Sequence, residues 1–385
     1  MKISKAANSI ELSLTRQLFN KAAQYENVID LTLGDPDIAP SKIIKEAAAK
    51  AIFDGKTKYS ANAGLLSFRQ AVADNFYKEY GIEVNPDGQI MATVGGMEAL
   101  YLSLACMLDE GDEVIIFAPY YVNYKQMIRI CGGNPVIVNT YEKDGFSISK
   151  EMLQNAITER TVAIIINTPS NPTGAVLDAD SLKNVAEAAI RNDLIVISDE
   201  VYRTLIYNGV KHQSIVTLPE MKERTVVIDS ISKRFAMTGY RLGYAIGPET
   251  IIANMTKMQE NVAACAPLPS QYAAIAALEQ CAKSTEIVDE FQTRRDYLYE
   301  AINSIDGLSC IKPAATFYLF VNIEKSGMDS IEFANRLLEE VQVAVVPGVT
   351  YGDNYNNYVR IAYTVKVDIL KKAVERINRF MKGLN

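Results

Sequence analysis

Short runs in which every residue is apolar constrain the fold of this 385-residue chain most strongly. Residues 163–166 read Ala-Ile-Ile-Ile, and residues 194–197 read Leu-Ile-Val-Ile. As strands, such runs present hydrophobic side chains on both faces, which is typical of central strands that helices cover from two sides. The runs therefore predict the interior of a layered sheet.

Similar runs alternate with amphipathic stretches along most of the chain. Predicted strands lie at residues 89–94, 113–117, 135–139, 162–167, 194–198, 225–229 and 242–246. Predicted helices, with apolar residues at three- and four-residue spacing, lie at residues 97–108, 121–131, 149–156 and 178–191. The alternation predicts an α/β fold with a mostly parallel, doubly wound sheet.

The pattern changes towards both ends of the chain. A helix at 41–54 is predicted between Ser41, as N-cap, and Gly55. The last part predicts helices at 284–305, 329–340 and 366–382 and strands at 308–312, 316–322, 342–346 and 358–363. We therefore expect a large α/β domain at residues 46–280 and a smaller α+β domain at 281–385. The segment 1–45 is expected to pack with the smaller domain, and a continuous helix to join the two domains.

Composition argues against several classes of function. With 39 basic and 46 acidic residues the net charge is −7, whereas a protein that grips nucleic-acid backbone is usually basic. Residues 1–8 lack the apolar run of a signal peptide. No stretch of about 18 apolar residues predicts a membrane span. We expect a cytoplasmic protein that contacts neither nucleic acid nor membrane.

Histidine occurs once, at His212. Histidine metal sites and a serine triad both need imidazole at a defined place, and no metal-binding spacing is present. The five cysteines form no CxxC pair, so no zinc site or disulfide framework is indicated. We interpret His212 as a surface residue of the polar stretch 209–213. Acid–base chemistry in an enzyme of this composition is expected to fall on Lys, Tyr, Asp or a cofactor.

Polar residues follow four of the predicted strands. They lie at residues 95–96, 167–174, 198–202 and 230–233. Ligands of open α/β sheets bind at the carboxyl ends of the strands, so the four segments predict one shared site. Within it, Lys233 follows a strand among small and aromatic residues. Partial desolvation would lower the pKa of its amine and suit it to Schiff-base chemistry, although an isolated lysine is more often a solvated surface charge.

The sequence around Lys233 carries a specific resemblance. Residues 230–243, Ser-Ile-Ser-Lys-Arg-Phe-Ala-Met-Thr-Gly-Tyr-Arg-Leu-Gly, resemble the pyridoxal-phosphate attachment signature of class I aminotransferases at each constrained position. Further matching segments follow in the same order over nearly the whole chain, at residues 31–36, 58–59, 171–174, 198–202 and 358–363. The chain is identified as a member of the aspartate-aminotransferase-like class I/II family of fold-type-I pyridoxal-phosphate enzymes, in its bacterial branch.

The resemblance implies roles around the cofactor ring. Lys233 would hold the cofactor and move a proton between the substrate and the cofactor. Asp199 would pair with the pyridine nitrogen. Its alternative role is to cap a helix or a turn. Tyr202 and Asn171 would donate hydrogen bonds to the 3′-oxygen of the cofactor. Tyr121 would stack on the ring. Its alternative role is to pack in the hydrophobic core.

The resemblance also implies how both anionic groups are bound. The cofactor phosphate would lie at the start of the helix that Gly95 and Gly96 open, because helix N-termini bind anions. Its remaining contacts would come from Met97, Ser230, Ser232, Arg241 and, from a neighbouring subunit, Tyr59. Arg360 lies inside an apolar strand, where a guanidinium needs an anion. Arg360 would bind the substrate α-carboxylate together with the backbone amide of Gly34. The alternative role of its guanidinium is an internal salt bridge.

The resemblance also implies an activity. The chain is expected to be a homodimeric aminotransferase with shared sites, which exchanges an amino group between an L-amino acid and a 2-oxo acid by a ping-pong reaction. A pyridoxal-phosphate C–S β-lyase and a non-catalytic binding protein are the alternatives. Related acidic-substrate enzymes can carry a lysine after the paired glycines, facing the distal carboxylate. Met97 stands there, which favours an aromatic or other neutral donor over aspartate.

Overall fold

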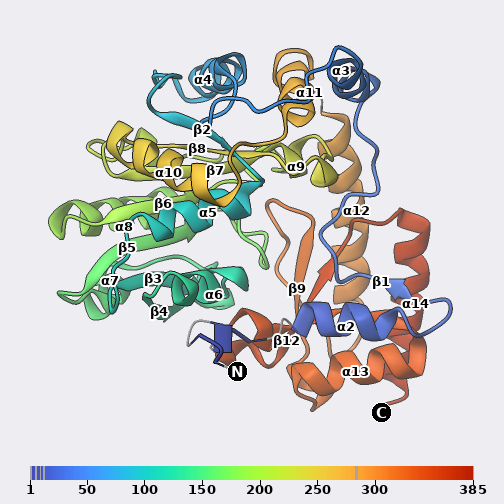
Figure 1. Ribbon diagram of the computed structural model, residues 1–385. Coiled ribbons are helices and arrows are strands. Elements are labelled where there is room, and N and C mark those ends of the chain that lie inside the picture. The colour runs from blue at the N-terminus through green and yellow to red at the C-terminus, as the bar shows by residue number, and fades with distance from the viewer. Residues whose placement is uncertain (1, 5–6, 9, 12–13, 282–284, 385) are drawn as a thin grey trace.

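A sheet of seven strands forms the centre of the larger part of the molecule (Figure 1). The structure, a computed structural model, describes residues 2–4, 7–8, 10–11, 14–281 and 285–384. The strand order is β2-β8-β7-β6-β5-β3-β4. The strands are β2 (Ile90–Thr93), β3 (Glu113–Ala118), β4 (Asn134–Asn139), β5 (Thr161–Asn167), β6 (Ile195–Asp199), β7 (Thr225–Ser230) and β8 (Gly243–Ile246).

Most neighbouring strands of this sheet run parallel. The four pairings between β7 and β4 are parallel, while β8 runs antiparallel to both β2 and β7. Every strand predicted between residues 89 and 246 is present. The predicted α/β fold with a mostly parallel sheet is confirmed.

Helices cover both faces of the sheet, as the doubly apolar runs predict. On one face Ile165 and Ile197 pack with α5 (Gly96–Ala105) and α10 (Glu249–Val262). On the other face Ile164 and Val196 pack with side chains of α7 (Lys150–Ala156) and α8 (Ala179–Arg191). Further helices of this region are α3 (Lys42–Phe53), α4 (Leu66–Tyr80), α6 (Asn123–Ile130), α9 (Ile231–Arg234) and α11 (Leu268–Gln280). Of these, α3, α4 and α11 pack together at the β2 end of the sheet (Figure 1).

Two small sheets lie at the centre of the smaller part of the molecule. One joins β9 (Tyr318–Asn322), β12 (Tyr358–Ala362) and β11 (Val346–Pro347) in antiparallel fashion. The other pairs β1 (Ile29–Asp30) with β10 (Val343–Ala344) in parallel. Their core is shared with α2 (Leu14–Ala22), α12 (Glu286–Asn303), α13 (Ser330–Val341) and α14 (Val367–Lys382). The N-terminal segment thus packs with C-terminal elements, while domain boundaries after residues 45 and 280 stay a prediction.

Two local predictions in the C-terminal part are wrong. No continuous helix joins the two regions, because Cys281 and Thr285 are not helical and α12 begins only after Thr285. Residues 308–312 form no strand apart from one bridge between Ser309 and Asn322. Side chains bind the backbone there: Asn303 accepts from the Cys310 amide at 3.0 Å, and Glu142 accepts from the Ile311 amide at 3.1 Å.

The described part of the chain contains no helix with both the length and the apolar character that a membrane span requires. Residues 1, 5 and 6, which belong to the segment predicted to carry no signal peptide, lie outside the described residues.

Candidate active site

A cavity of about 480 Å³ lies at the carboxyl ends of β5, β6 and β7. Asn167, Asp199 and Ser230, the last residues of these three strands, all line it. Except for Gly95 and Tyr59, every site residue proposed from the sequence lines it too: Gly34, Gly96, Met97, Tyr121, Asn171, Asp199, Tyr202, Ser230, Ser232, Lys233, Arg241 and Arg360. The fold thus brings together residues from almost the entire length of the chain.

Lys233 projects into this cavity from the short helix α9. Ser230 caps the helix by accepting a hydrogen bond from the Ser232 amide at 3.1 Å. The Lys233 Nζ donates to the Gly34 carbonyl at 2.6 Å and lies 5.5 Å from the centre of the Phe317 ring. Burial lowers the pKa of the amine to about 8. A much larger neutral fraction is therefore available near neutral pH than for a surface lysine.

Gly34 is required by the close packing opposite Lys233. A Cβ atom at this position would lie 1.8 Å from the Tyr318 hydroxyl oxygen. Because no side chain fits, the backbone at residue 34 can approach both Tyr318 and the Lys233 amine.

Asp199 brings a buried carboxylate to the same cavity from the end of β6. Its Oδ2 accepts a hydrogen bond from the Tyr124 hydroxyl at 2.5 Å, and its Oδ1 accepts from the Val201 amide at 3.3 Å. Burial raises the pKa of Asp199 to about 6, while the bond from Tyr124 works in the opposite direction. The carboxyl is therefore mostly ionised at neutral pH. A cationic group in the cavity would find a fixed counter-charge here.

Tyrosines form another part of the wall. The hydroxyls of Tyr202 and Tyr318 lie 3.1 Å apart, and burial raises the pKa of Tyr202. Tyr121 packs edge-on against Tyr124, with ring centres 5.5 Å apart. Its hydroxyl donates to the Met97 sulfur at 3.7 Å. Tyr121 therefore lines the cavity while also packing against other aromatic side chains.

The start of α5 and Arg241 form a positively polarised corner. Gly95, with φ of 77°, precedes the helix, and a Cβ atom there would come within 2.7 Å of the Arg241 Nη2. The glycine therefore allows the guanidinium to lie close to the helix N-terminus, although Gly95 itself does not line the cavity. The Ser230 hydroxyl donates to that of Ser232 at 2.8 Å beside this corner. Helix amides, hydroxyls and a guanidinium together suit an anion such as phosphate.

Arg360 is a buried cation whose described partners carry no charge. Only 4% of the residue is exposed on β12. Its Nη1 donates to the Asn171 side-chain oxygen at 3.0 Å, and its Nη2 donates to the Thr32 carbonyl. Its Nε is buried and has no hydrogen-bond partner among the described residues. The guanidinium therefore has unused capacity to bind an anion in the cavity.

Tyr59, unlike Gly95, makes no described contact with a residue of the cavity wall. It is 86% exposed and does not line the cavity of its own chain. Within one chain, the structure places it on the surface.

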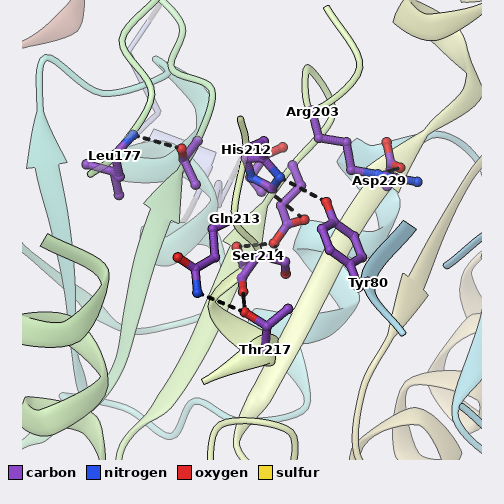
Figure 2. Close-up of polar contacts among 12 residues, drawn as sticks. Tyr80, Leu177, Arg203, His212, Gln213, Ser214, Thr217 and Asp229 are labelled. Carbon is purple, nitrogen blue, oxygen red and sulfur yellow. Dashed lines mark hydrogen bonds and ion pairs between the residues drawn. The ribbon is translucent and has the colours of Figure 1, made fainter. Parts of the chain in front are cut away.

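The prediction that His212 is a surface residue is wrong (Figure 2). Its side chain is only 3% exposed. The imidazole Nδ1 lies 2.9 Å from the Tyr80 hydroxyl, and its Nε2 lies 3.9 Å from the Glu200 carboxylate. Burial lowers the pKa of His212 and raises that of Glu200, so the imidazole is neutral near pH 7. Neither of these two residues lines the cavity.

Sequence reasoning missed four other polar residues at this site. Tyr124 could have been found, because it lies three residues after Tyr121 on the same face of a predicted helix. Tyr318, Asn123 and Arg16 also line the cavity or contact its residues, but no motif marks them. Their places depend on how separate elements pack, which the local sequence does not express.

Comparison with known proteins shows what this chain resembles. The family described as Aminotransferase class I and II matches residues 26–377. The chain is 39% identical to aromatic-amino-acid aminotransferase 2 of Thermococcus litoralis, over 99% of both chains. It is 40% identical to an aspartate aminotransferase of Geobacillus stearothermophilus, over 100% of both chains.

A solved structure is similar over almost the whole fold. The aspartate aminotransferase of Thermus thermophilus with maleate superposes with a TM-score of 0.93 at 35% identity, over 98% of this chain and 99% of that one. Sequence and structure therefore agree, and the chain belongs to the class I and II aminotransferase family.

Proposed function

We propose that this aminotransferase binds pyridoxal phosphate in the cavity and transfers an amino group between an L-amino acid and a 2-oxo acid. The observation that carries the proposal is the presence of Lys233, Asp199, Arg241 and Arg360 on the wall of one cavity. A neutralisable amine, a buried carboxylate and two cations are thereby available for four different groups of cofactor and substrate.

The residues present fit the chemistry of the cofactor. The corner at Arg241, with the first amides of α5 and the hydroxyls of Ser230 and Ser232, suits its phosphate. Asp199 suits its pyridine nitrogen, and the amine of Lys233 suits its aldehyde. Asn171 and Tyr202 would bind its ring oxygen, and Tyr121 would lie against its ring. When bound, pyridoxal phosphate supplies an electron sink for electrons released at the substrate Cα.

Lys233 is proposed to hold the cofactor and to serve as the general base. With its pKa lowered to about 8, the amine can be neutral to accept a proton from the substrate Cα and can return it afterwards. Asp199, anionic at neutral pH, would keep a positive charge on the facing nitrogen. Holding that charge in a buried site favours withdrawal of electrons from the substrate.

Arg360 is proposed to orient the substrate by its α-carboxylate. The guanidinium is fixed by Asn171 and Thr32, and its free Nε leaves capacity for an additional acceptor. Fixing the carboxylate fixes where the Cα proton lies relative to Lys233. The relatives named above act, by their names, on aspartate and on aromatic amino acids, and we propose both classes as donors here.

Transamination differs from the β-lyase alternative in stoichiometry. The purified protein, loaded with pyridoxal phosphate and given an amino donor but no acceptor, should release one 2-oxo acid per chain and stop, because the amino group stays on the enzyme. Adding a 2-oxo acid should restart turnover. Continuous release of pyruvate and ammonia from a cysteine conjugate without an acceptor would support the lyase, and no product at all would contradict both.

We further propose that two chains form a homodimer whose sites are shared. Supporting this, Tyr59 lies outside its own cavity, and large apolar side chains are exposed on both sides of its loop. Ile52 and Phe53, at the end of the preceding helix α3, are 53% and 89% exposed. Val262, at the end of α10, is 53% exposed, and Asn62 of the loop donates to the Ala264 carbonyl just beyond it. Where exposed apolar side chains gather into a patch, another chain often covers it. Tyr59 of one chain would then reach the cofactor phosphate of the other.

Mixing inactive variants tests the shared site. Tyr59→Phe and Lys233→Ala chains, each of low activity, should form heterodimers with one intact and one doubly defective site. Activity should therefore rise above the sum of the parents as subunits exchange. Each heterodimer should reach about half of the wild-type value, because one site of two is intact, and a fully exchanged equimolar mixture about a quarter, because about half of its dimers are heterodimers. Verified exchange without a rise in activity would show that Tyr59 acts within its own chain or not at all.

A further inference from the structure

One buried arginine behind the wall of the cavity has no part in the reaction described above. Arg203 follows Tyr202 in the chain, yet it does not line the cavity, and only 3% of it is exposed. A guanidinium removed from water needs anionic partners, because an unpaired charge inside a protein is costly. The groups that bind Arg203 therefore indicate what it stabilises.

Two carboxylates and a tyrosine bind Arg203, and Figure 2 shows it beside Asp229. Its Nε donates to the Asp229 Oδ2 at 2.6 Å, and its Nη1 donates to Glu79 of α4. Its Nη2 donates to the Tyr244 hydroxyl at 3.3 Å, which in turn donates to the Asp229 Oδ2 at 2.6 Å. We call these four residues the rear cluster. Since Asp229 is only 5% exposed, its charge is balanced mainly by Arg203.

The rear cluster and the cavity lie on opposite faces of the sheet. Asp229 is opposite Tyr244 in the antiparallel pair of β7 and β8. One position on, Ser230 is opposite Gly243. Because successive side chains of a strand point to opposite faces, Asp229 and Tyr244 reach the cluster on one face, while Ser230 lies in the cavity wall on the other.

The ends of these two strands carry the phosphate corner, formed by Ser230, Arg241 and the start of α5. The Ser230 hydroxyl donates to the Leu242 carbonyl at 3.0 Å, in the residue that follows Arg241. Gly243 packs so closely against the turn before α5 that a Cβ atom there would lie 2.5 Å from the Gly96 nitrogen. A group that fixes the residue before Ser230 and the residue after Gly243 therefore fixes the phosphate corner from behind.

Charge also links the rear cluster to the phosphate corner. Asp229 precedes Ser230, and its Oδ1 accepts a hydrogen bond from the Ser230 amide at 2.6 Å. A phosphate bound at the corner would therefore lie near a buried carboxylate, which repels it unless a cation balances the charge. The ion pair with Arg203 supplies that cation.

We propose that Arg203 is a positioning residue for the cofactor phosphate. It acts from behind the phosphate corner, by holding the ends of β7 and β8 and by neutralising Asp229. The proposal rests on the proposed function, in which this corner binds the phosphate of the cofactor. Arg203 itself touches neither cofactor nor substrate, since it lies outside the cavity wall.

Two forms of the cofactor separate a phosphate-specific role from a structural one. Pyridoxal has the ring and aldehyde of pyridoxal phosphate but no phosphate, and absorbance titration of the full-length protein gives a dissociation constant for each. Arg203→Gln should raise the constant for pyridoxal phosphate by about 10- to 100-fold, the range typical of outer contacts that orient ligand-binding groups. The constant for pyridoxal should change by less than about threefold, because no phosphate meets the uncovered charge of Asp229.

Arg69→Gln is the matched control. Arg69 is another buried arginine, on α4, which binds Asp87 at 3.2 Å and does not line the cavity. This substitution should leave both dissociation constants unchanged, even where it lowers the melting temperature. The double variant Arg203→Gln/Asp229→Asn removes both charges of the buried pair, so its constant for pyridoxal phosphate should return to within about threefold of wild type.

Tyr244→Phe tests the rear cluster with little disturbance of the fold. The ring stays, and the group lost is the hydroxyl that donates to Asp229. The constant for pyridoxal phosphate should rise by about two- to fivefold, less than a whole hydrogen bond to a charged group contributes, because Arg203 still holds Asp229. The constant for pyridoxal should not change. This variant decides the question if Arg203→Gln does not fold.

The possible failures are distinguishable. Equal weakening for pyridoxal and pyridoxal phosphate in Arg203→Gln, or no weakening for either, would overturn the proposal. So would a double variant that binds pyridoxal phosphate no better than Arg203→Gln, or a Tyr244→Phe variant with wild-type constants. In each of these cases, a wild-type protein that binds pyridoxal phosphate and transaminates leaves the proposed function standing. A wild-type protein that binds no pyridoxal phosphate would contradict the proposed function itself.

Discussion

Replacing Lys233 by alanine should lower kcat/KM for transamination by about 10⁴-fold, the upper range for removal of a general base. The amine is the only one that lines the cavity among the described residues, and its pKa, lowered to about 8, suits proton transfer near neutral pH. Steady-state assays with a donor and a 2-oxo acid measure the loss. The cavity walls should persist, because Lys233 makes one hydrogen bond to the Gly34 carbonyl and packs near the Phe317 ring.

Lys211 offers a matched control for the lysine substitution. It is exposed and does not line the cavity. Lys211→Ala should retain wild-type kcat/KM, and both variants should keep the wild-type circular dichroism spectrum. More than about 1% residual activity in Lys233→Ala would mean that another group carries the proton, since a positioned base contributes at least about 10²-fold.

Substitution of Asp199 by asparagine should reduce kcat by about 10²- to 10³-fold, which is the range for removing one preorganised electrostatic contact. Asparagine keeps the volume of the side chain but loses the negative charge that a protonated ring nitrogen requires. Since the carboxyl is buried, water does not screen the missing charge. Cofactor binding, measured by absorbance titration, should fall far less than kcat, and near-normal turnover would show that Asp199 is only structural.

Tyr124→Phe provides a finer variant of the same test. The Tyr124 hydroxyl donates to Asp199 at 2.5 Å and lowers the pKa of this carboxyl, which burial raises to about 6. Without the hydroxyl the pKa of Asp199 should rise further, so protonation begins at higher pH. The acid limb of the kcat profile should therefore move to higher pH, while the plateau above it stays close to wild type. An acid limb at its original pH would show that another group sets it.

The sequence predicts the central sheet well, because both faces of its strands are buried. Ile164 and Ile165 pack on opposite faces, and a run that is apolar on both sides has few other stable places in a fold. The fold also brings most of the predicted site residues together, because they follow strands whose carboxyl ends meet at one edge of the sheet. Polar residues at strand ends and the segment around Lys233 are local features that a sequence expresses directly.

The errors concern contacts between distant segments. The neighbours of His212 are exposed, as their polarity predicts, but its imidazole turns inwards to Tyr80, 132 positions away. The stretch at 308–312 looks like a strand, yet side chains from other elements bind its amides. No motif marks Arg16, because the place of its helix depends on distant packing: Lys21 of α2 binds Glu339 of α13, 318 positions further along the chain. Periodicity carries no information on such pairings.

The role proposed for Lys233, as the residue that holds pyridoxal phosphate in the cavity, can be tested directly. Treating the cofactor-loaded protein with sodium borohydride makes the bond between lysine and cofactor permanent, and peptide mass spectrometry then locates it. The predicted result is one phosphopyridoxyl group per chain, on the peptide that contains Lys233, and none in Lys233→Ala. A label on a different lysine, or no label after saturation with the cofactor, would show that Lys233 does not hold the cofactor.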